Sequence, residues 1–200
     1  NADPVNTWRY LSQFEPPIID FLLPHANWDN PPTSHRENDY TKYGNWMISI
    51  FDDWFNGYKS HIRIRFFEEI LYRLFGHKGS LESLGTEEVG LITISSNGAY
   101  EQVDTMKSVF PGAQNIGLNV IDNDLDEVLL QKGVKDRQLG ISGLSSKCQN
   151  CKVVNICGGG YYPHRYSQIN EFNNPSVYCE DLFMLITHIE SKVILKLEKE

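Results

Sequence analysis

The sequence has no long apolar run and no excess of basic residues. Its longest hydrophobic candidate is the strand-sized segment 18–24, IIDFLLP, whereas a membrane-spanning helix needs about 18 consecutive apolar residues. The formal net charge is −8, with 18 Lys and Arg against 26 Asp and Glu, which opposes binding to the phosphate backbone of nucleic acids. We therefore expect neither a membrane nor a nucleic acid as a partner.

Other features are also missing or scarce. Residues 1–10 have neither the basic start nor the apolar stretch of a secretory leader, so we expect a cytoplasmic protein. Four cysteines in 200 residues are too few for a disulfide scaffold, and the chain has no internal repeat. The length suffices for one large domain or two small ones. The first residue is Asn1 and not Met, which favours a fragment or a processed chain.

The cysteines gather near the C-terminal end of the sequence. They are Cys148 and Cys151, which form a CxxC pair, followed by Cys157 and Cys179. A CxxC turn lets two sulfurs converge on one metal, and four thiolates satisfy either a structural zinc ion or an iron–sulfur cluster. The spacing alone does not separate these two, and buried free cysteines or disulfides are the alternatives without a metal.

Three consecutive glycines follow the third cysteine: Gly158, Gly159 and Gly160. Glycine lets the backbone pass close to a bulky inorganic core, and its N–H groups are suited to donate to cluster sulfides. A single zinc ion needs less room, so the glycines favour the cluster. A flexible turn is the alternative interpretation.

Periodicity and turn signals predict the elements around these motifs. We expect helices at 3–14, 39–56, 66–75, 122–133 and about 177–197, a buried strand at 18–23, a hairpin through Asn97 and Gly98, and a short strand at 115–120. The buried face of the last helix is predicted at Leu182, Leu185, Ile186, Ile189, Val193 and Leu197. A boundary near residues 79–86 separates two halves.

A long polar loop follows the predicted strand at 18–23. The α/β barrels place functional residues in the loops that follow their parallel strands. The candidates for a substrate-facing surface in this loop are His25, Asn27, Trp28 and Asp29. The alternative is a surface turn shaped by its prolines.

Two segments carry a resemblance to a known family. CQNCKVVNICGGGYYPHRY at 148–166 and FNNPSVYCEDL at 172–182 resemble the C-terminal SPASM domain of radical SAM peptide maturases, most closely the FxsB-like branch. FLLPHANWDNPP at 21–32 resembles the last barrel strand and its loop, and ITISSNGAYEQVD at 92–104 the hairpin that opens a SPASM domain.

This resemblance implies an α+β fold and covers nearly the whole chain. Residues 1–85 would form the last strand and helices of a partial (β/α) barrel. Residues 86–200 would form a SPASM domain with a β-hairpin, a cysteine-rich metal loop and a C-terminal helix.

The resemblance also implies the ligand set. The residues that match the ligands of an outer auxiliary [4Fe-4S] cluster are Cys148, Cys151, Cys157 and Cys179. An inner cluster would need one cysteine soon after Gly98 and another where Tyr161 stands, so we expect a single cluster. The motif CxxxCxxC, which the family uses to cleave S-adenosylmethionine, does not occur in this sequence. We expect S-adenosylmethionine and a second [4Fe-4S] cluster only in a full-length enzyme with an N-terminal radical SAM portion, and no activity from this chain alone.

The implied function is a part of a radical SAM enzyme that abstracts hydrogen from a ribosomally synthesised precursor peptide and crosslinks it. The auxiliary cluster would transfer electrons or hold the fold. His164 and Arg165 would meet acidic groups of the peptide or hydrogen-bond the cluster ligands, unless they are a buried pair that pins the loop. The rival interpretations are a zinc-ribbon-like binding module with four cysteines and a degenerate SPASM protein that recognises peptides without chemistry. Zinc is also expected if the thiols are misloaded.

Overall fold

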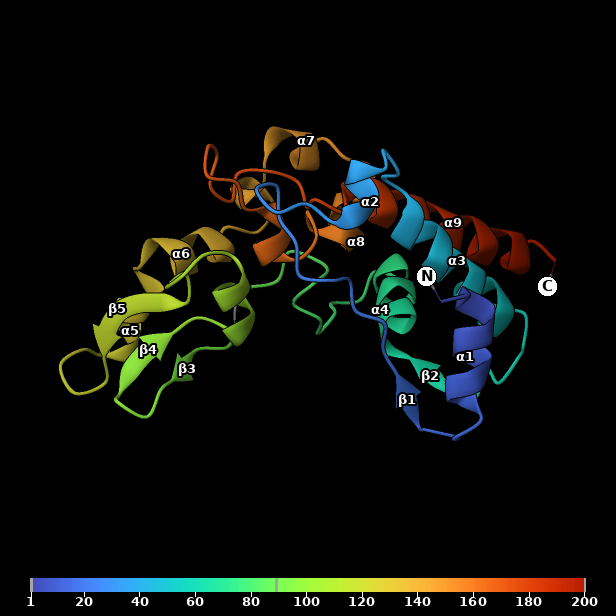
Figure 1. Cartoon of the computed structure of the whole chain (residues 1–200), viewed down its shortest axis with the longest axis horizontal. Coiled ribbons are helices and arrows are strands. Elements are labelled where there is room, and N and C mark those ends of the chain that lie inside the picture. Colours follow the sequence, from blue (N-terminus) through green and yellow to red (C-terminus); the bar gives the residue numbers. More distant parts are fainter. Residues whose placement is uncertain (1, 89, 200) are drawn as a thin grey trace.

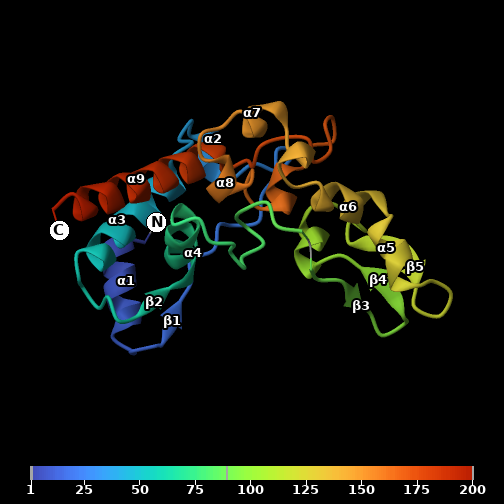
Figure 2. The same ribbon diagram turned by 180° about the vertical axis from the view of Figure 1, so that it is seen from behind.

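The protein is a mixed helix and sheet structure with two lobes, seen in a computed structural model that describes residues 2–88 and 90–199 (Figure 1). One lobe contains α1, α3, α4, α9, β1 and β2, and the other contains β3 to β5 with α5 and α6. The short helices α2, α7 and α8 lie between the lobes, and the view from behind shows the same arrangement (Figure 2). Both ends of the chain lie in the first lobe.

Helix α1, Pro4–Ser12, begins as its sequence predicts. The Asp3 side chain accepts a hydrogen bond from the backbone N–H of Asn6 at 2.7 Å, and Pro4 occupies the first helical position. The helix packs against α3 and buries Trp8 completely.

Two short parallel strands start the first lobe. Strand β1, Ile18–Ile19, pairs with β2, Arg63–Ile64, in the register Ile18 to Arg63. The predicted strand at 18–23 is wrong in length, because the Asp20 carboxylate accepts bonds from Phe21 N–H and from Arg65 and turns the chain out of the ladder. Since the two strands are parallel, their carboxyl ends lie at the same end of this small sheet.

Three helices build the main core: α3 at Lys42–Phe55, α4 at Arg65–Leu74 and α9 at Cys179–Leu197. The apolar face of α9 packs along α3 and also contacts α4. The prediction for this face is confirmed through Ile189, and Val193 is partly buried against the same cluster. It is wrong for Leu197, which is 58% exposed. Helix α9 has 19 residues and α3 has 14, so the last turn of α9 extends beyond its neighbour.

The second lobe contains an antiparallel sheet in the order β3-β4-β5. Its strands are Thr93–Ile94, Ala99–Glu101 and Asn115–Asn119. Gly98 forms the predicted turn with a φ of 82°, a conformation that favours glycine. Helices α5, Leu125–Leu129, and α6, Lys132–Lys135, cover a small cluster around Tyr100, and α5 starts with a capping box.

Several separate parts of the chain connect the two lobes, and they have little regular structure. Their helices are α2, Thr33–Arg36, α7, Ser146–Gln149, and α8, Val154–Cys157. Short 3-10 turns lie at Asp104–Ser108, Asp136–Gln138, Gly140–Gly143 and Tyr162–Arg165. The cysteine-rich segment is therefore held between the two lobes by turns and by the helices at its ends.

The main core crosses the predicted boundary between residues 1–85 and 86–200. Val153, Val177 and the buried face of α9 belong to the same hydrophobic cluster as α1, α3 and α4. The C-terminal helix is thus part of the core that the first 85 residues build.

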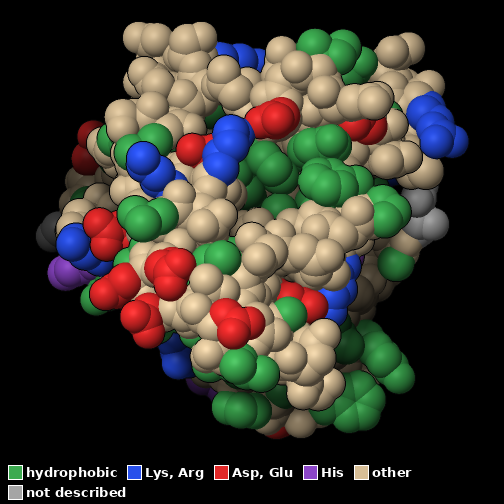
Figure 3. Space-filling view, turned by 90° about the vertical axis from the view of Figure 1, so that its left-hand side faces the viewer, with side chains coloured by type: hydrophobic (Ala, Val, Ile, Leu, Met, Phe, Trp, Pro, Cys, Tyr) green, Lys and Arg blue, Asp and Glu red, His purple; other side chains and the backbone are tan. Residues whose placement is uncertain are grey.

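The described surface carries charged side chains of both signs (Figure 3). On the face that carries the β3–β5 sheet, Lys and Arg side chains are scattered among acidic and hydrophobic ones (Figure 3). Across residues 2–88 and 90–199, no helix combines the length and the apolar character that crossing a bilayer requires.

Candidate metal centre

The four cysteines surround one pocket, which we call the cysteine pocket. Its volume is about 450 Å³, and its lining includes Cys148, Cys151, Cys157 and Cys179. Cys148 lies on α7, Cys157 ends α8 and Cys179 begins α9. All four are free thiols, so the disulfide alternative is wrong.

Local backbone turns bring the thiols to this pocket. The N–H of Cys151 donates to the carbonyl of Cys148 at 3.0 Å, which closes the CxxC turn. The N–H of Cys179 donates to the carbonyl of Ser176 at 2.9 Å, just where α9 starts. Two tight turns and two helix ends thus place the ligands that the sequence predicts as a set.

The three consecutive glycines are here called the glycine loop. Their φ angles are 58°, 77° and 72°, values that residues with a side chain rarely adopt. A Cβ on Gly158 would lie 1.7 Å from the carbonyl oxygen of Gly85, and one on Gly160 would lie 2.8 Å from the Ser176 side chain. Gly158 is therefore required by close approach to the backbone of Gly85, and Gly160 by close approach to the side chains of Ser176 and Leu182, which the sequence interpretation missed. Gly159 does line the cysteine pocket, and its N–H donates to the sulfur of Cys157.

Arg165 holds the glycine loop in place. Its Nη2 donates to the carbonyl oxygens of Gly158 at 2.6 Å and of Gly160 at 2.8 Å. Burial lowers the pKa of Arg165, and the nearby thiols of Cys157 and Cys148 act in the opposite direction. The side chain pins the loop and also places a cationic group beside two of the predicted ligands.

Burial opposes ionisation of two of the thiols, Cys157 and Cys179. It raises the pKa of Cys157 to about 12, and the neighbouring Cys179 and Cys148 add to this shift. Burial also raises the pKa of Cys179, although the ammonium of Lys147 lowers it. Four crowded thiolates are stable together only when cationic charge compensates them. The donor set therefore fits a metal centre.

The arrangement does not form a preformed site for one ion. No three His, Cys, Asp or Glu side chains in residues 2–88 and 90–199 are grouped to hold a single metal ion. A tetrahedral zinc ion with Zn–S bonds of about 2.3 Å needs its sulfurs about 3.8 Å apart. The cysteines instead line a pocket with room for a group of several atoms.

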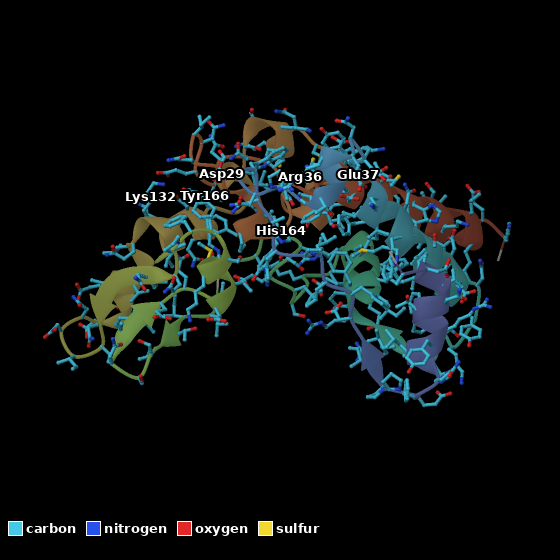
Figure 4. All side chains as sticks on the ribbon, in the orientation of Figure 1. Asp29, Arg36, Glu37, Lys132, His164 and Tyr166 are labelled. Atoms are coloured by element: carbon cyan, nitrogen blue, oxygen red, sulfur yellow. The ribbon has the colours of Figure 1, made fainter. Side chains whose placement is uncertain are left out.

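His164 behaves differently from its neighbour Arg165. It is 4% exposed, and in the described part of the chain neither ring nitrogen has a hydrogen-bond partner. Its imidazole lies edge to face between Tyr161, at a centroid distance of 5.3 Å, and Tyr178, at 5.0 Å. Figure 4 shows His164 in the middle of the molecule, between the two lobes. Thus Arg165, and not the imidazole of His164, pins the loop.

The candidate loop after β1 is mostly fixed to the rest of the protein. Asn27 is 2% exposed, and its Oδ1 accepts bonds from the N–H groups of Asp29 and Asn30, so its side chain is buried within its own turn. Trp28 Nε1 donates to the carbonyl of Pro175 at 2.8 Å. Asp29 accepts from the N–H of Gln168 at 2.8 Å, close to the labelled Tyr166 (Figure 4).

His25 lines a second pocket, which we call the histidine pocket because His164 lines it too. Its volume is about 260 Å³, and it receives residues from the ends of β1 and β2 and from Thr105 and Tyr161. The sequence interpretation missed Thr105 and Tyr161 as members of a shared site. The aromatic run YYPHRY at 161–166 was a local signal for Tyr161, and no local signal pointed to Thr105.

The comparisons with known proteins show the fold. No family model and no curated protein sequence matches the chain. Among solved structures, anSMEcpe with bound AdoMet and the Kp18Cys peptide matches with a TM-score of 0.67 and 17% identity, over 98% of this chain and 56% of that one. A histidine-tagged form of anSMEcpe with bound AdoMet matches with a TM-score of 0.67 and 18% identity, over 98% and 53%.

These neighbours are structures of an anaerobic sulfatase-maturating enzyme of the radical SAM/SPASM type. This chain spans a little over half of their length and has the fold of their C-terminal part. The expected α+β fold class is thereby confirmed.

Proposed function

We propose that this chain is the C-terminal, auxiliary-cluster part of a radical SAM enzyme that modifies a ribosomally synthesised precursor peptide, from the FxsB-like branch. One observation carries the proposal: three free thiols from residues 148–157 and a fourth from the start of α9 line one pocket in a chain with this fold. Residues 1–85 would contribute the end of the barrel and residues 86–200 the auxiliary domain. The protein would act in the cytoplasm.

The four cysteines would hold one [4Fe-4S] cluster. When bound, such a cluster supplies an electron acceptor or a structural crosslink. The chain's own groups favour an anionic centre: the N–H of Gly159 donates to Cys157, and the charges of Arg165 and Lys147 lie near the thiols. Hydrogen bonds and charges of this kind tune the reduction potential of iron–sulfur centres.

The peptide substrate is supported by the fold neighbour. That protein is described with a bound peptide and AdoMet, and we transfer both to the complete enzyme of which this chain would be a part. S-adenosylmethionine and a second [4Fe-4S] cluster would bind to the N-terminal radical SAM portion. Hydrogen abstraction and crosslinking would then require both portions.

Anaerobic reconstitution tests the cluster. We expect about four iron and four sulfide per chain with a broad visible absorption, because a single cubane cluster has that composition. Each Cys→Ser variant at the four ligands should lose this iron, whereas Ser146→Ala on the exposed side of α7 should retain it. About eight iron would contradict the single cluster.

Two further measurements separate the proposed function from its alternatives. A colourless sample that binds one zinc after anaerobic reconstitution with iron and sulfide would support the zinc-ribbon-like module instead. The reduced chain alone should produce no 5′-deoxyadenosine from S-adenosylmethionine, because it lacks CxxxCxxC. Formation of this product would contradict our assignment of the chain to the C-terminal part.

A further inference from the structure

The histidine pocket lies where parallel strands usually present ligands. Phe21 to His25 follow the end of β1, Arg65 and Phe66 follow the end of β2, and all of these except Pro24 line the pocket. Ligands of α/β folds bind outside the carboxyl ends of their strands. Tyr161 and His164 from the cysteine-bearing half also line the pocket.

The polar groups around this pocket are mostly engaged with one another. The hydroxyls of Thr105 and Tyr161 bond each other, and Arg65 donates to Asp20 at 2.7 Å. Among the lining groups in the described residues, His164 is buried at 4% exposure and neither of its ring nitrogens has a partner. Buried polar groups are nearly always hydrogen-bonded, since an unmade bond costs about 1–3 kcal/mol. An imidazole left in this state on a pocket wall points to a ligand.

The remaining lining sets the character of that ligand. Apart from the histidines it contains several large apolar side chains: Phe21, Leu22, Leu23, Phe66, Leu81 and Leu182. The volume of about 260 Å³ lies below the range of about 300–1,000 Å³ that whole small molecules occupy. The pocket therefore fits one large side chain and not a complete cofactor.

We propose that the histidine pocket binds a large, mainly apolar side chain of the peptide that ends in a hydrogen-bonding group, and that His164 receives that group. The peptide as the source of the side chain rests on the proposed function. Burial, with a smaller effect of His25, lowers the pKa of His164 to about 4, so the ring is neutral at pH 7. A neutral imidazole offers one donor and one acceptor, which matches a hydroxyl better than a carboxylate.

Tyrosine meets this description, and phenylalanine is its matched control. Titration of the 200-residue chain with N-acetyl-tyrosinamide and N-acetyl-phenylalaninamide, followed by NMR, compares two probes that differ by one hydroxyl. We expect the tyrosine probe to bind about threefold to tenfold more tightly, the range for one neutral hydrogen bond. His164→Leu should reduce this ratio to about one, and His77→Leu, at an exposed position, should preserve it.

The wild-type protein provides a test that does not depend on a variant folding. In protein with ¹⁵N-labelled histidine, the ring nitrogens of His164 should shift with the tyrosine probe and much less with the phenylalanine probe. Equal affinities, no binding of either probe, or a ratio that survives in His164→Leu would overturn the proposal.

Iron content in the same sample keeps the two proposals apart. Discrimination between the probes without iron binding would reject the auxiliary cluster and keep the pocket. A full cluster without discrimination would reject the pocket and keep the cluster.

Discussion

The helical core and the cysteine-rich segment are stabilised in different ways. In the core, α3, α4 and α9 bury large apolar side chains, and Phe51 and Phe67 are 0% exposed. The segment from α7 to the start of α9 contains only four-residue helices in its described part and relies on turns and on the contacts of Arg165. Burial alone can hold the first region, whereas the second needs fixed backbone geometry and, in our proposal, a metal.

Helix α9 connects these two regions. Its first residue is Cys179, and two residues later the carboxylate of Asp181 accepts a bond from the N–H of Gly44 at 2.7 Å. Further along, His188 pairs with Asp52 at 2.8 Å. The helix is thus anchored in the core independently of the cysteine pocket, so loss of the metal should loosen the loop and leave the helix in place.

The largest expected effect is in the core. Phe51→Ala should lower the free energy of unfolding by about 3–5 kcal/mol, because the ring contacts Phe55 and Phe67 in a fully packed site. Urea unfolding followed by circular dichroism measures this change. Phe14→Ala, where the side chain is 68% exposed, should change it by less than about 0.5 kcal/mol. Similar losses in both variants would contradict the contrast between core and surface.

The variant Cys179→Ser tests how the cysteine-rich segment is stabilised. Ligation of Cys157 and Cys179 to one metal group closes the intervening loop, which contributes about 3 kcal/mol in the chain-entropy model for a crosslink. We expect loss of the cluster and faster hydrogen exchange over 158–176, with protection of α3 and α4 unchanged.

The control for this variant is Ser191→Ala, on the exposed side of the same helix. It should leave both iron content and exchange unchanged. If Cys179→Ser retains its iron and its protection over 158–176, Cys179 is a buried cysteine and the fourth ligand lies elsewhere.

The pH dependence of the free energy of unfolding should reveal the burial of the neutral His164 imidazole. Its folded pKa of about 4 lies below the usual histidine value of about 6.5, so between these pH values the unfolded chain binds a proton that the folded chain excludes. This contribution is fully present above about pH 6.5 and is lost as the pH falls toward 4, by up to roughly 3 kcal/mol.

The comparison with His164→Leu isolates this contribution. Burial raises the pKa of Asp181 to about 6, which acts in the opposite direction over an overlapping range. The difference between wild type and His164→Leu cancels this background. His77→Leu should keep the wild-type profile, and an unchanged profile in His164→Leu would show that the imidazole is not buried.

The smallest expected effect concerns Arg165. Arg165→Gln removes the donors to the carbonyls of Gly158 and Gly160 and should cost about 1–2 kcal/mol. Hydrogen exchange should accelerate mainly at the glycine loop, and α4 should not change. Arg36→Gln, at an exposed position, is the control and should leave the loop unaffected.

Local signals in the sequence determined much of what is seen. Asp3 with Pro4 predicts the start of α1, Asn97 with Gly98 predicts the hairpin, and the acidic start of 122–133 agrees with the capping box of α5. Each of these depends on bonds between residues a few positions apart, so composition and order suffice to find them. The four cysteines were predicted as a set from their clustering and from the family resemblance, and the structure brings them to one pocket.

The tertiary structure decided what depends on residues far apart in the chain. It placed α9 in the core of the first half, set Gly158 against Gly85, and brought the Asn27 amide to the carbonyl oxygen of Val109. It also joined the ends of β1 and β2 to Thr105 and His164 in one pocket. None of these contacts has a local signature, because each joins residues that are far apart in the sequence and meet only when the chain has folded. The sequence thus determined the elements and the candidate ligands, and packing decided which buried side chains were left with free hydrogen-bonding groups.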